Sequence, residues 1–304
     1  SDYLHKYGTK GKDDPNNRAA NRDLLDDGTL YVAKFSEGGM MKWLPLVYGQ
    51  GPLTGKNGFK NQGDVLIETR YAADLLGATP MDRPEDVETN PVNGRTYVLL
   101  TKNEKRKQDK PHKGFGRKSN APTNVVNTRM QNSHGQIIEL IPPTVNGKAD
   151  HAASEYRWEF FLMGGDPKNP KDKAKYHKSV TANGWLSTPD NVAFDPKGRI
   201  WLATDGQGAK QRGGYSDALY AADTTGPGRG LTRGFLTAPR GAETCGPTFT
   251  PDAKTLFLNI QGPGTDKKSG FKDASTRWPD NNPDMPPRPS LIVITKDDGG
   301  EIGS

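Results

Sequence analysis

The segment at residues 81–103, MDRPEDVETNPVNGRTYVLLTKN, decides the fold that we predict for this chain. It opens with a charged cluster, passes through a turn at 90–94, and ends in a β-branched and aromatic run at 96–101. A run of that composition bounded by turn residues predicts a β-strand. The cluster includes Arg83, Glu85, Asp86 and Glu88. Because side chains alternate between two faces along a strand, these four cannot all converge on one site.

The same order of features returns twice farther along the chain. Residues 189–204, PDNVAFDPKGRIWLAT, again place an acid after a proline, then an apolar pair, an Asp-Pro turn and an aromatic-containing run. Residues 245–261, CGPTFTPDAKTLFLNIQ, are a looser third copy. When the turn prolines are superposed, Glu85 and Asp190 share one position, which Cys245 occupies in the third copy. Carboxylates that recur at one place in a repeated hairpin predict a metal site on a β-propeller.

The spacing of the repeats is uneven. Their turn prolines, Pro91, Pro196 and Pro251, are separated by 105 and then 55 residues. We therefore expect the repeats to mark equivalent inner strands of non-adjacent blades, with long polar loop insertions between them.

Length and composition fit a protein made of many short strands joined by turns. The chain has 304 residues, of which 36 are glycine and 24 are proline, and only 32% are hydrophobic. This composition suits turn-rich β-structure better than a helical bundle. We predict an all-β fold and, because no Gly/Ser-rich or Pro-rich linker divides the chain, a single domain over residues 1–304. No apolar run approaches the roughly 18 residues of a membrane span, so no transmembrane segment is expected.

Local patterns add a hairpin and one short helix. Residues 24–46 predict the hairpin, with an Asp-Asp-Gly entry turn and Gly38-Gly39 before the returning strand. Residues 64–76, DVLIETRYAADLL, place most of their apolar side chains on one helical face. We expect Asp64 to be the N-cap of this helix and Gly77 its C′ residue.

The formal net charge is +6, and much of this positive charge lies in loop-like runs at 102–118 and 168–178. We predict that these runs are solvated loops, which leaves room for attraction of an anionic substrate. No RNA-binding or zinc-finger signature is present, so no nucleic-acid partner is expected. The single cysteine, Cys245, excludes an internal disulfide, and we expect it to be a buried small side chain.

Several further polar groups are candidates for chemistry. Asp190 and Asn191 belong with Asp205 at the end of the same hairpin, and Glu243 follows Arg240 in the segment PRGAETCGP. Carboxylate and amide oxygens favour Ca²⁺ or Mg²⁺ over zinc. A site of this kind also suits a phosphate, because the metal polarises its oxygens and an arginine donates paired hydrogen bonds to it. Turn residues and scattered histidines are not expected in the site: Asn90, Gly94, Asp195, His5, His112, His134, His151 and His177.

With these residues set out, the chain resembles the PhoX family of alkaline phosphatases. The resembling segments follow the order of the family: 24–35 (LLDDGTLYVAKF), 81–103, 187–206 (STPDNVAFDPKGRIWLATDG) and 239–264 (PRGAETCGPTFTPDAKTLFLNIQGPG). The resemblance implies a six-bladed β-propeller that hydrolyses phosphomonoesters with Ca²⁺ and Fe³⁺ on its axis. It also implies export to the periplasm or the extracellular space.

The resemblance assigns roles by motif. Arg83 would hold the substrate phosphate, Glu85 and Asp190 would be metal ligands, and Glu243 is a third metal candidate because its segment resembles a family motif. Where the family often has Gln-His-Pro-Gly-Glu, this chain has QGPGT at 261–265. We expect the chain to correspond to the C-terminal half to two-thirds of the family's propeller.

Three functions follow from this comparison. The first is a phosphatase of phosphate-ester small molecules whose site is completed by an N-terminal fragment or a second chain. The second is a non-catalytic extracellular propeller, either a structural protein or one that binds an anionic partner. The third is a lactonase-like propeller with one Ca²⁺ held by Glu85, Asn191 and either Asp190 or Asp205.

Overall fold

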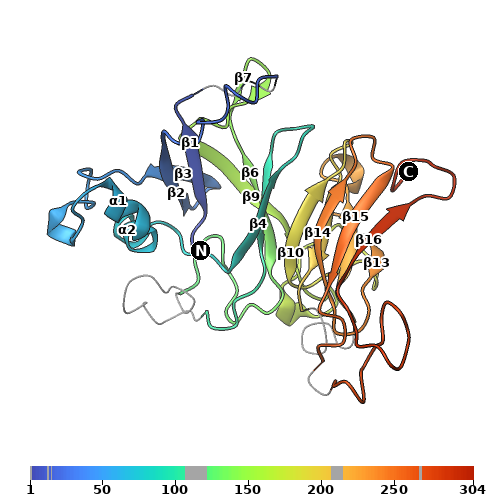
Figure 1. The fold of residues 1–304 in the computed structure, drawn as a ribbon. Coiled ribbons are helices and arrows are strands. Elements are labelled where there is room, and N and C mark those ends of the chain that lie inside the picture. Colours follow the sequence, from blue (N-terminus) through green and yellow to red (C-terminus); the bar gives the residue numbers. More distant parts are fainter. Residues whose placement is uncertain (1, 12–13, 15, 107–121, 207–214, 267–268) are drawn as a thin grey trace. The chain divides into compact units, whose positions relative to one another are not determined.

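The computed structural model of the chain describes residues 2–11, 14, 16–106, 122–206, 215–266 and 269–304 (Figure 1). The chain divides into two compact units. The first comprises Ser1–Pro84, Lys105–Gln131 and Ile141–Trp158, and the second comprises Glu85–Glu104, Asn132–Leu140 and Glu159–Ser304. Much of the basic run predicted at 102–118, with His112, lies outside the described residues. The second basic run, at 168–178, is a mostly exposed loop that contains the 3-10 helix η2 (Pro170–Asp172).

The first unit is built on an antiparallel sheet. Its strands are β1 (His5–Thr9), β2 (Gly28–Ser36), β3 (Met40–Pro45) and the first residues of β9 (Glu155–Met163). They pair in the order β1-β2-β3-β9. The hairpin β2–β3 confirms the prediction for residues 24–46, and Gly38 and Gly39 adopt the positive φ angles of its turn. A small ribbon of β7 (Thr144–Val145) and β8 (Lys148–Ala149) also belongs to this unit.

Two helices cover this sheet where one was predicted. They are α1 (Gln62–Ile67) and α2 (Thr69–Leu76), preceded by the 3-10 helix η1 (Gly55–Asn57). The single-helix prediction was wrong because the backbone leaves helical geometry at Glu68, with φ −91° and ψ 38°. Asp64 is not the N-cap. That role belongs to Asn61, whose side chain accepts a hydrogen bond from the Asp64 N–H. Gly77 closes α2 in the left-handed conformation, as predicted.

The second unit consists of antiparallel meanders (Figure 1). One sheet contains β4 (Pro84–Thr89), β5 (Thr96–Leu100), β6 (Gln136–Ile141) and the last residues of β9. The next contains β10 (Pro189–Phe194), β11 (Ile200–Thr204), β12 (Ala218–Ala222) and β13 (Arg233–Thr237). The third contains β14 (Glu243–Phe249), β15 (Thr255–Gln261) and β16 (Ser290–Thr295). A four-stranded meander is the form of a propeller blade. The helices of the chain are few and short, including η3 (Gly226–Gly228), so the predicted all-β class is confirmed.

The three repeats lie on neighbouring sheets, so their predicted placement on non-adjacent blades was wrong. Asp86 on β4 accepts a hydrogen bond from the Val192 N–H on β10 at 2.8 Å, and Asn191 on β10 accepts one from the Gly246 N–H on β14 at 2.9 Å. The spacing is uneven because two long stretches between the first and second repeats, Lys105–Gln131 and Ile141–Trp158, belong to the first unit instead of forming a blade.

Apolar side chains fill the space between successive sheets of the second unit. Tyr97 and Leu99 of β5 share one core cluster with Leu202 of β11. On the other face of the β10–β13 sheet, Trp201 packs in a second cluster with Leu258 of β15. Burial on both faces holds these sheets face to face, as in a propeller, and fixes where each strand presents its polar side chains.

A carboxylate cluster on β4, β10 and β14 as the candidate active site

The acids of the first two repeats follow the same unusual turn. Arg83 and Thr188 each have a φ of 50°, and each precedes a proline that opens the strand, Pro84 or Pro189. The left-handed conformation is rare for large or β-branched residues and costs about 1–3 kcal/mol. Its recurrence at equivalent positions indicates that this turn sets the direction of the acid that comes two residues later.

Glu243, the first residue of β14, lies among other carboxylates. Its pKa is raised above the ordinary value, first by partial burial and then by the negative charges of Asp205 and Glu85. The pKa of the Cys245 thiol is affected by carboxylates of the same region. Burial raises this pKa most, followed by the hydrogen bond to Glu243 and by the charges of Glu243, Asp190 and Asp205. The carboxylates of β4, β10 and β14, with Asp205 directly after β11, therefore form one electrostatic neighbourhood within the second unit.

Both carboxylate oxygens of Glu243 accept hydrogen bonds. The Cys245 thiol donates to Oε1 at 3.1 Å, and the Gln261 amide donates to Oε2 at 2.7 Å. Glu243 and Gln261 face each other across the β14–β15 pair. A thiol that donates is protonated, so Cys245 is arranged here as a partner of Glu243 and not as a thiolate ligand.

The donor set suits a hard cation, because carboxylate and amide oxygens are the ligands of Ca²⁺ and Mg²⁺. In the part of the chain that the structure describes, however, no three His, Cys, Asp or Glu side chains converge closely enough to hold a metal ion. Glu243 would also have to exchange a present hydrogen bond for a metal bond. The described residues thus bring several acids near one another, but these acids do not form a complete set of metal ligands.

The structure brings together three of the four residues chosen from the sequence: Glu85, Asp190 and Glu243. Arg83 belongs to the first unit, where it is exposed at the end of the segment that leads into β4. Arg240 was grouped with Glu243 in the sequence, but its guanidinium lies 3.3 Å from Asp266.

Sequence reasoning gave less weight to two members of the neighbourhood. Asp205 precedes a glycine and was equally consistent with a turn, and only the position of β11 beside β14 brings it to the cluster. Gln261 stood out in the sequence only as part of a polar segment that begins QGPGT, and the register of the β14–β15 hairpin places it opposite Glu243. Cys245 is half-buried, so its predicted burial is only partial.

A serine, a histidine and an aspartate also meet in this unit, although no histidine was predicted to act. The His134 Nδ1 shares a hydrogen bond with the Ser187 hydroxyl, and its Nε2 lies 3.4 Å from an Asp172 carboxylate oxygen. Ser187 has no exposed surface, so its hydroxyl cannot reach a substrate. This trio therefore joins the loop at 164–188 to the sheet and is not a catalytic triad.

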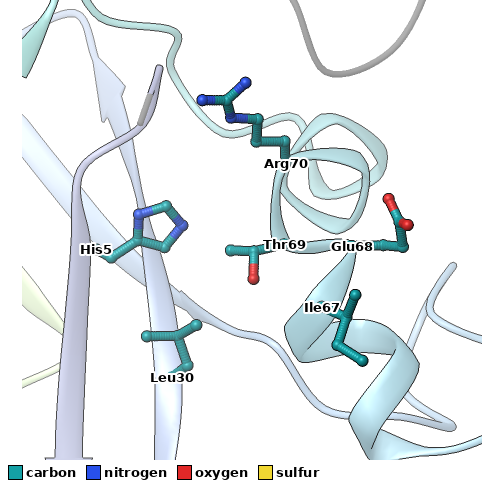
Figure 2. Close-up of a pocket in the computed structure, with 6 residues that line it drawn as sticks. All are labelled: His5, Leu30, Ile67, Glu68, Thr69 and Arg70. Atoms are coloured by element: carbon teal, nitrogen blue, oxygen red, sulfur yellow. The ribbon is translucent and has the colours of Figure 1, made fainter.

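The first unit has a cavity of about 440 Å³ beside β1 and the start of α2 (Figure 2). It is lined by His5, Leu30, Ile67, Glu68, Thr69 and Arg70. Figure 2 shows the His5 ring turned toward α2, and the buried Nε2 of His5 has no hydrogen-bond partner among the described residues. Burial lowers the pKa of His5. None of the residues predicted for the active site lines this cavity.

Helices that could cross a membrane are missing from the described residues, because every helix there is too short or too polar.

Comparisons with known proteins agree on one family. The model of the family described as alkaline phosphatase PhoX matches residues 1–264. Among solved structures, the chain is similar to Pseudomonas fluorescens PhoX in complex with vanadate, a transition state analogue, with a TM-score of 0.85 and 34% sequence identity. This match covers 99% of the present chain and 50% of that chain, so the chain spans about half the length of this relative. The search of curated proteins found no match. The chain therefore belongs to the PhoX family of alkaline phosphatases.

Proposed function

We propose that this chain forms part of a metal-dependent phosphomonoesterase of the PhoX type. One observation carries the proposal: Glu85 and Asp190, from the first two repeats, share one electrostatic neighbourhood with Glu243, which lies two residues before the third repeat. Carboxylates that act on one another's pKa repel one another, and a bound cation would offset their charge. Family membership and the vanadate complex of the related PhoX add support for phosphate as the group that is bound.

Glu85, Asp190 and Glu243 would supply carboxylate oxygens to Ca²⁺, for which this donor set is chemically suited. Fe³⁺ is proposed from the family alone, because the described cluster offers it no deprotonated thiol. A bound cation of this kind polarises phosphate oxygens and neutralises their charge.

Arg83 would hold the substrate phosphate through paired hydrogen bonds from its guanidinium. Its left-handed backbone restricts the directions in which the side chain can leave the turn before Pro84. Holding the phosphate in one orientation is itself a large part of catalysis in phosphoryl transfer. Arg83 is therefore proposed as the catalytic residue that binds substrate, while the carboxylates bind metal.

A further polypeptide portion would complete the site, either an N-terminal fragment or a second chain. The three-stranded sheet β14-β15-β16 supports this part of the proposal. Its edge strand β16 exposes Leu291 and Val293 by 58% and 59%, next to Phe257 on β15, while Ile292 and Ile294 face the core. A propeller blade normally buries both faces. The chain would then be a single domain that lacks the family's N-terminal blades, and its location would be periplasmic or extracellular.

The proposal is tested by measuring hydrolysis of p-nitrophenyl phosphate with Ca²⁺ and Fe³⁺ present. The chain is assayed alone and after co-expression with a polypeptide equivalent to the remaining half of the related PhoX. We expect turnover only from the co-purified pair, and a loss of at least about 100-fold in Arg83→Ala. Arg288→Ala, which removes an exposed arginine paired with Asp280, is the control and should leave turnover unchanged. Turnover by the purified chain alone would contradict the need for a second portion.

A non-catalytic propeller is the second candidate. It is favoured by the hydrogen bonds that already occupy both oxygens of Glu243. Elemental analysis of native protein separates the two functions, because stoichiometric calcium and iron would exclude the non-catalytic one and metal-free native protein would support it.

A further inference from the structure

We infer that Asp86 and Asn191 are positioning residues, whose hydrogen bonds to the next inner strand fix the spacing of β4, β10 and β14, the strands that carry Glu85, Asp190 and Glu243. The inference rests on the proposed metal-dependent function. It assigns a role to the residue that directly follows each acid, Glu85 and Asp190, and not to the acids themselves.

The two residues bind groups that would otherwise be unpaired. β10 and β14 are edge strands of their sheets, and an edge strand presents N–H groups that no neighbouring strand accepts. Asp86 accepts the Val192 N–H through Oδ2 at 2.8 Å, and Asn191 accepts the Gly246 N–H through Oδ1 at 2.9 Å. The side chains therefore join successive sheets along edges where no strand-to-strand ladder exists.

Asp86 and Asn191 occupy equivalent places in the first two repeats. The donors are nearly equivalent too. Val192 corresponds to Pro247 of β14, which has no N–H, and the bond is made one residue earlier by Gly246. Gly246 lies where the register between β14 and β15 shifts, so its N–H is free of the ladder. The same hydrogen bond between neighbouring sheets is thus made twice. In the second case its donor is one residue earlier, because Pro247 has no N–H.

Alternation along the strand separates the two tasks. Neighbouring residues of a strand point to opposite faces, so Glu85 and Asp86 leave β4 in different directions. Both oxygens of Asp86 are taken, because Oδ1 accepts the Val87 N–H at 2.8 Å and Oδ2 accepts that of Val192. Asp86 is therefore not placed as a metal ligand, although it stands beside one in the sequence.

A bound metal would tolerate little change in the spacing of these acids. Ca²⁺ binds its oxygen ligands at about 2.3–2.6 Å, so a shift of one strand by a few tenths of an ångström is enough to remove a ligand. Glu85 and Asp190 come from different sheets, and each follows its sheet if the sheets move apart.

The test uses Asp86→Ala, Asp86→Asn, Asn191→Ala and Asn191→Asp in the full chain, co-purified with the polypeptide that completes the proposed site, with Glu88→Ala as the control. Glu88 is an exposed carboxylate on the same strand, two residues after Asp86. Amide hydrogen exchange at Val192 and Gly246 is measured by NMR without metal, and the affinity for Ca²⁺ is measured by calorimetry. The alanine variants should speed exchange at their own donor about tenfold and weaken Ca²⁺ binding about tenfold.

The conservative variants distinguish the hydrogen bond from the charge. Asn191→Asp adds a charge but keeps the acceptor oxygen for the Gly246 N–H, so it should stay within about threefold of wild type, as should Glu88→Ala. Asp86→Asn keeps one acceptor oxygen for the two N–H groups that Asp86 binds, so its effect should lie between those of wild type and Asp86→Ala. Equal damage by Asn191→Asp and Asn191→Ala would overturn the inference. So would faster exchange with unchanged Ca²⁺ affinity, which would leave the bonds a purely structural role. Wild type that shows the expected exchange but binds no Ca²⁺ would instead contradict the metal-dependent function on which the inference rests.

Discussion

Replacing Arg106 with alanine should destabilise the first unit severely. The Arg106 Nε lies 2.5 Å from an Asp82 carboxylate oxygen, and both side chains are fully buried. The guanidinium also donates to the backbone carbonyls of Pro122 and Pro80. The substitution removes the ion-pair partner of a buried carboxylate, which costs about 3–5 kcal/mol. That is a large part of the roughly 5–15 kcal/mol by which a folded domain is stable.

Hydrogen exchange followed by mass spectrometry measures this loss in each unit separately. In peptides of the first unit, 3–5 kcal/mol corresponds to exchange that is faster by about a hundredfold to several thousandfold. Arg288→Ala is the matched control, because Arg288 and Asp280 form an ion pair that is 50% and 33% exposed, and its loss should cost less than about 1 kcal/mol. A cost for Arg106→Ala below about 1 kcal/mol would refute the reasoning, since it would mean that the Asp82 carboxylate does not depend on its partner.

Three further predictions concern the second unit. Burial and then Glu243 raise the pKa of the Cys245 thiol. Alkylation of Cys245 by iodoacetamide at pH 8 should therefore be slower than that of an unperturbed thiol, and Glu243→Gln should speed it. Equal alkylation rates in wild type and Glu243→Gln would contradict this. Although burial opposes it, hydrogen bonds from Tyr97 and Arg229 lower the pKa of Glu139. Its stabilisation should therefore be full above about pH 4.3 and disappear as the pH falls through its lower folded pKa, so the advantage of wild type over Glu139→Gln in urea unfolding should shrink at acid pH. We expect the purified chain to self-associate through β16, and Leu291→Lys with Val293→Lys to reduce this in sedimentation experiments, because both side chains are exposed on an edge strand; a monomeric wild type, or association unchanged in the variant, would contradict this.

The strands were the most predictable part of the fold. The β-branched and aromatic run at 96–101 became β5 with bounds within one residue of those predicted. β1 was not predicted, because HKYGT has neither alternation nor a hydrophobic run, and it forms a strand only by pairing with β2. The break between α1 and α2 at Glu68 was not predictable, because no glycine or proline marks it in the sequence. We attribute it to packing and not to local sequence.

The candidate site was predictable in its members and not in its arrangement. The superposed repeats pointed to Glu85 and Asp190 because both acids follow a proline that opens a strand. They did not show that Asp86 and Asn191 turn to the adjacent sheet, since that depends on which blades are neighbours. The interval of 105 residues between the first two repeats suggested that they lie on distant blades. Residues of the first unit, however, fill much of that interval.

The joints between the inner strands also have a direction. Each acceptor side chain comes earlier in the chain than the N–H that it binds: Asp86 precedes Val192, and Asn191 precedes Gly246. During synthesis, which proceeds from the N-terminus, the receiving side chain of each joint is already present when the next inner strand leaves the ribosome. We expect the sheets of the second unit to be added one at a time in chain order. Gly246, which stands where Asp86 and Asn191 stand in the earlier repeats, has no side chain to extend the series.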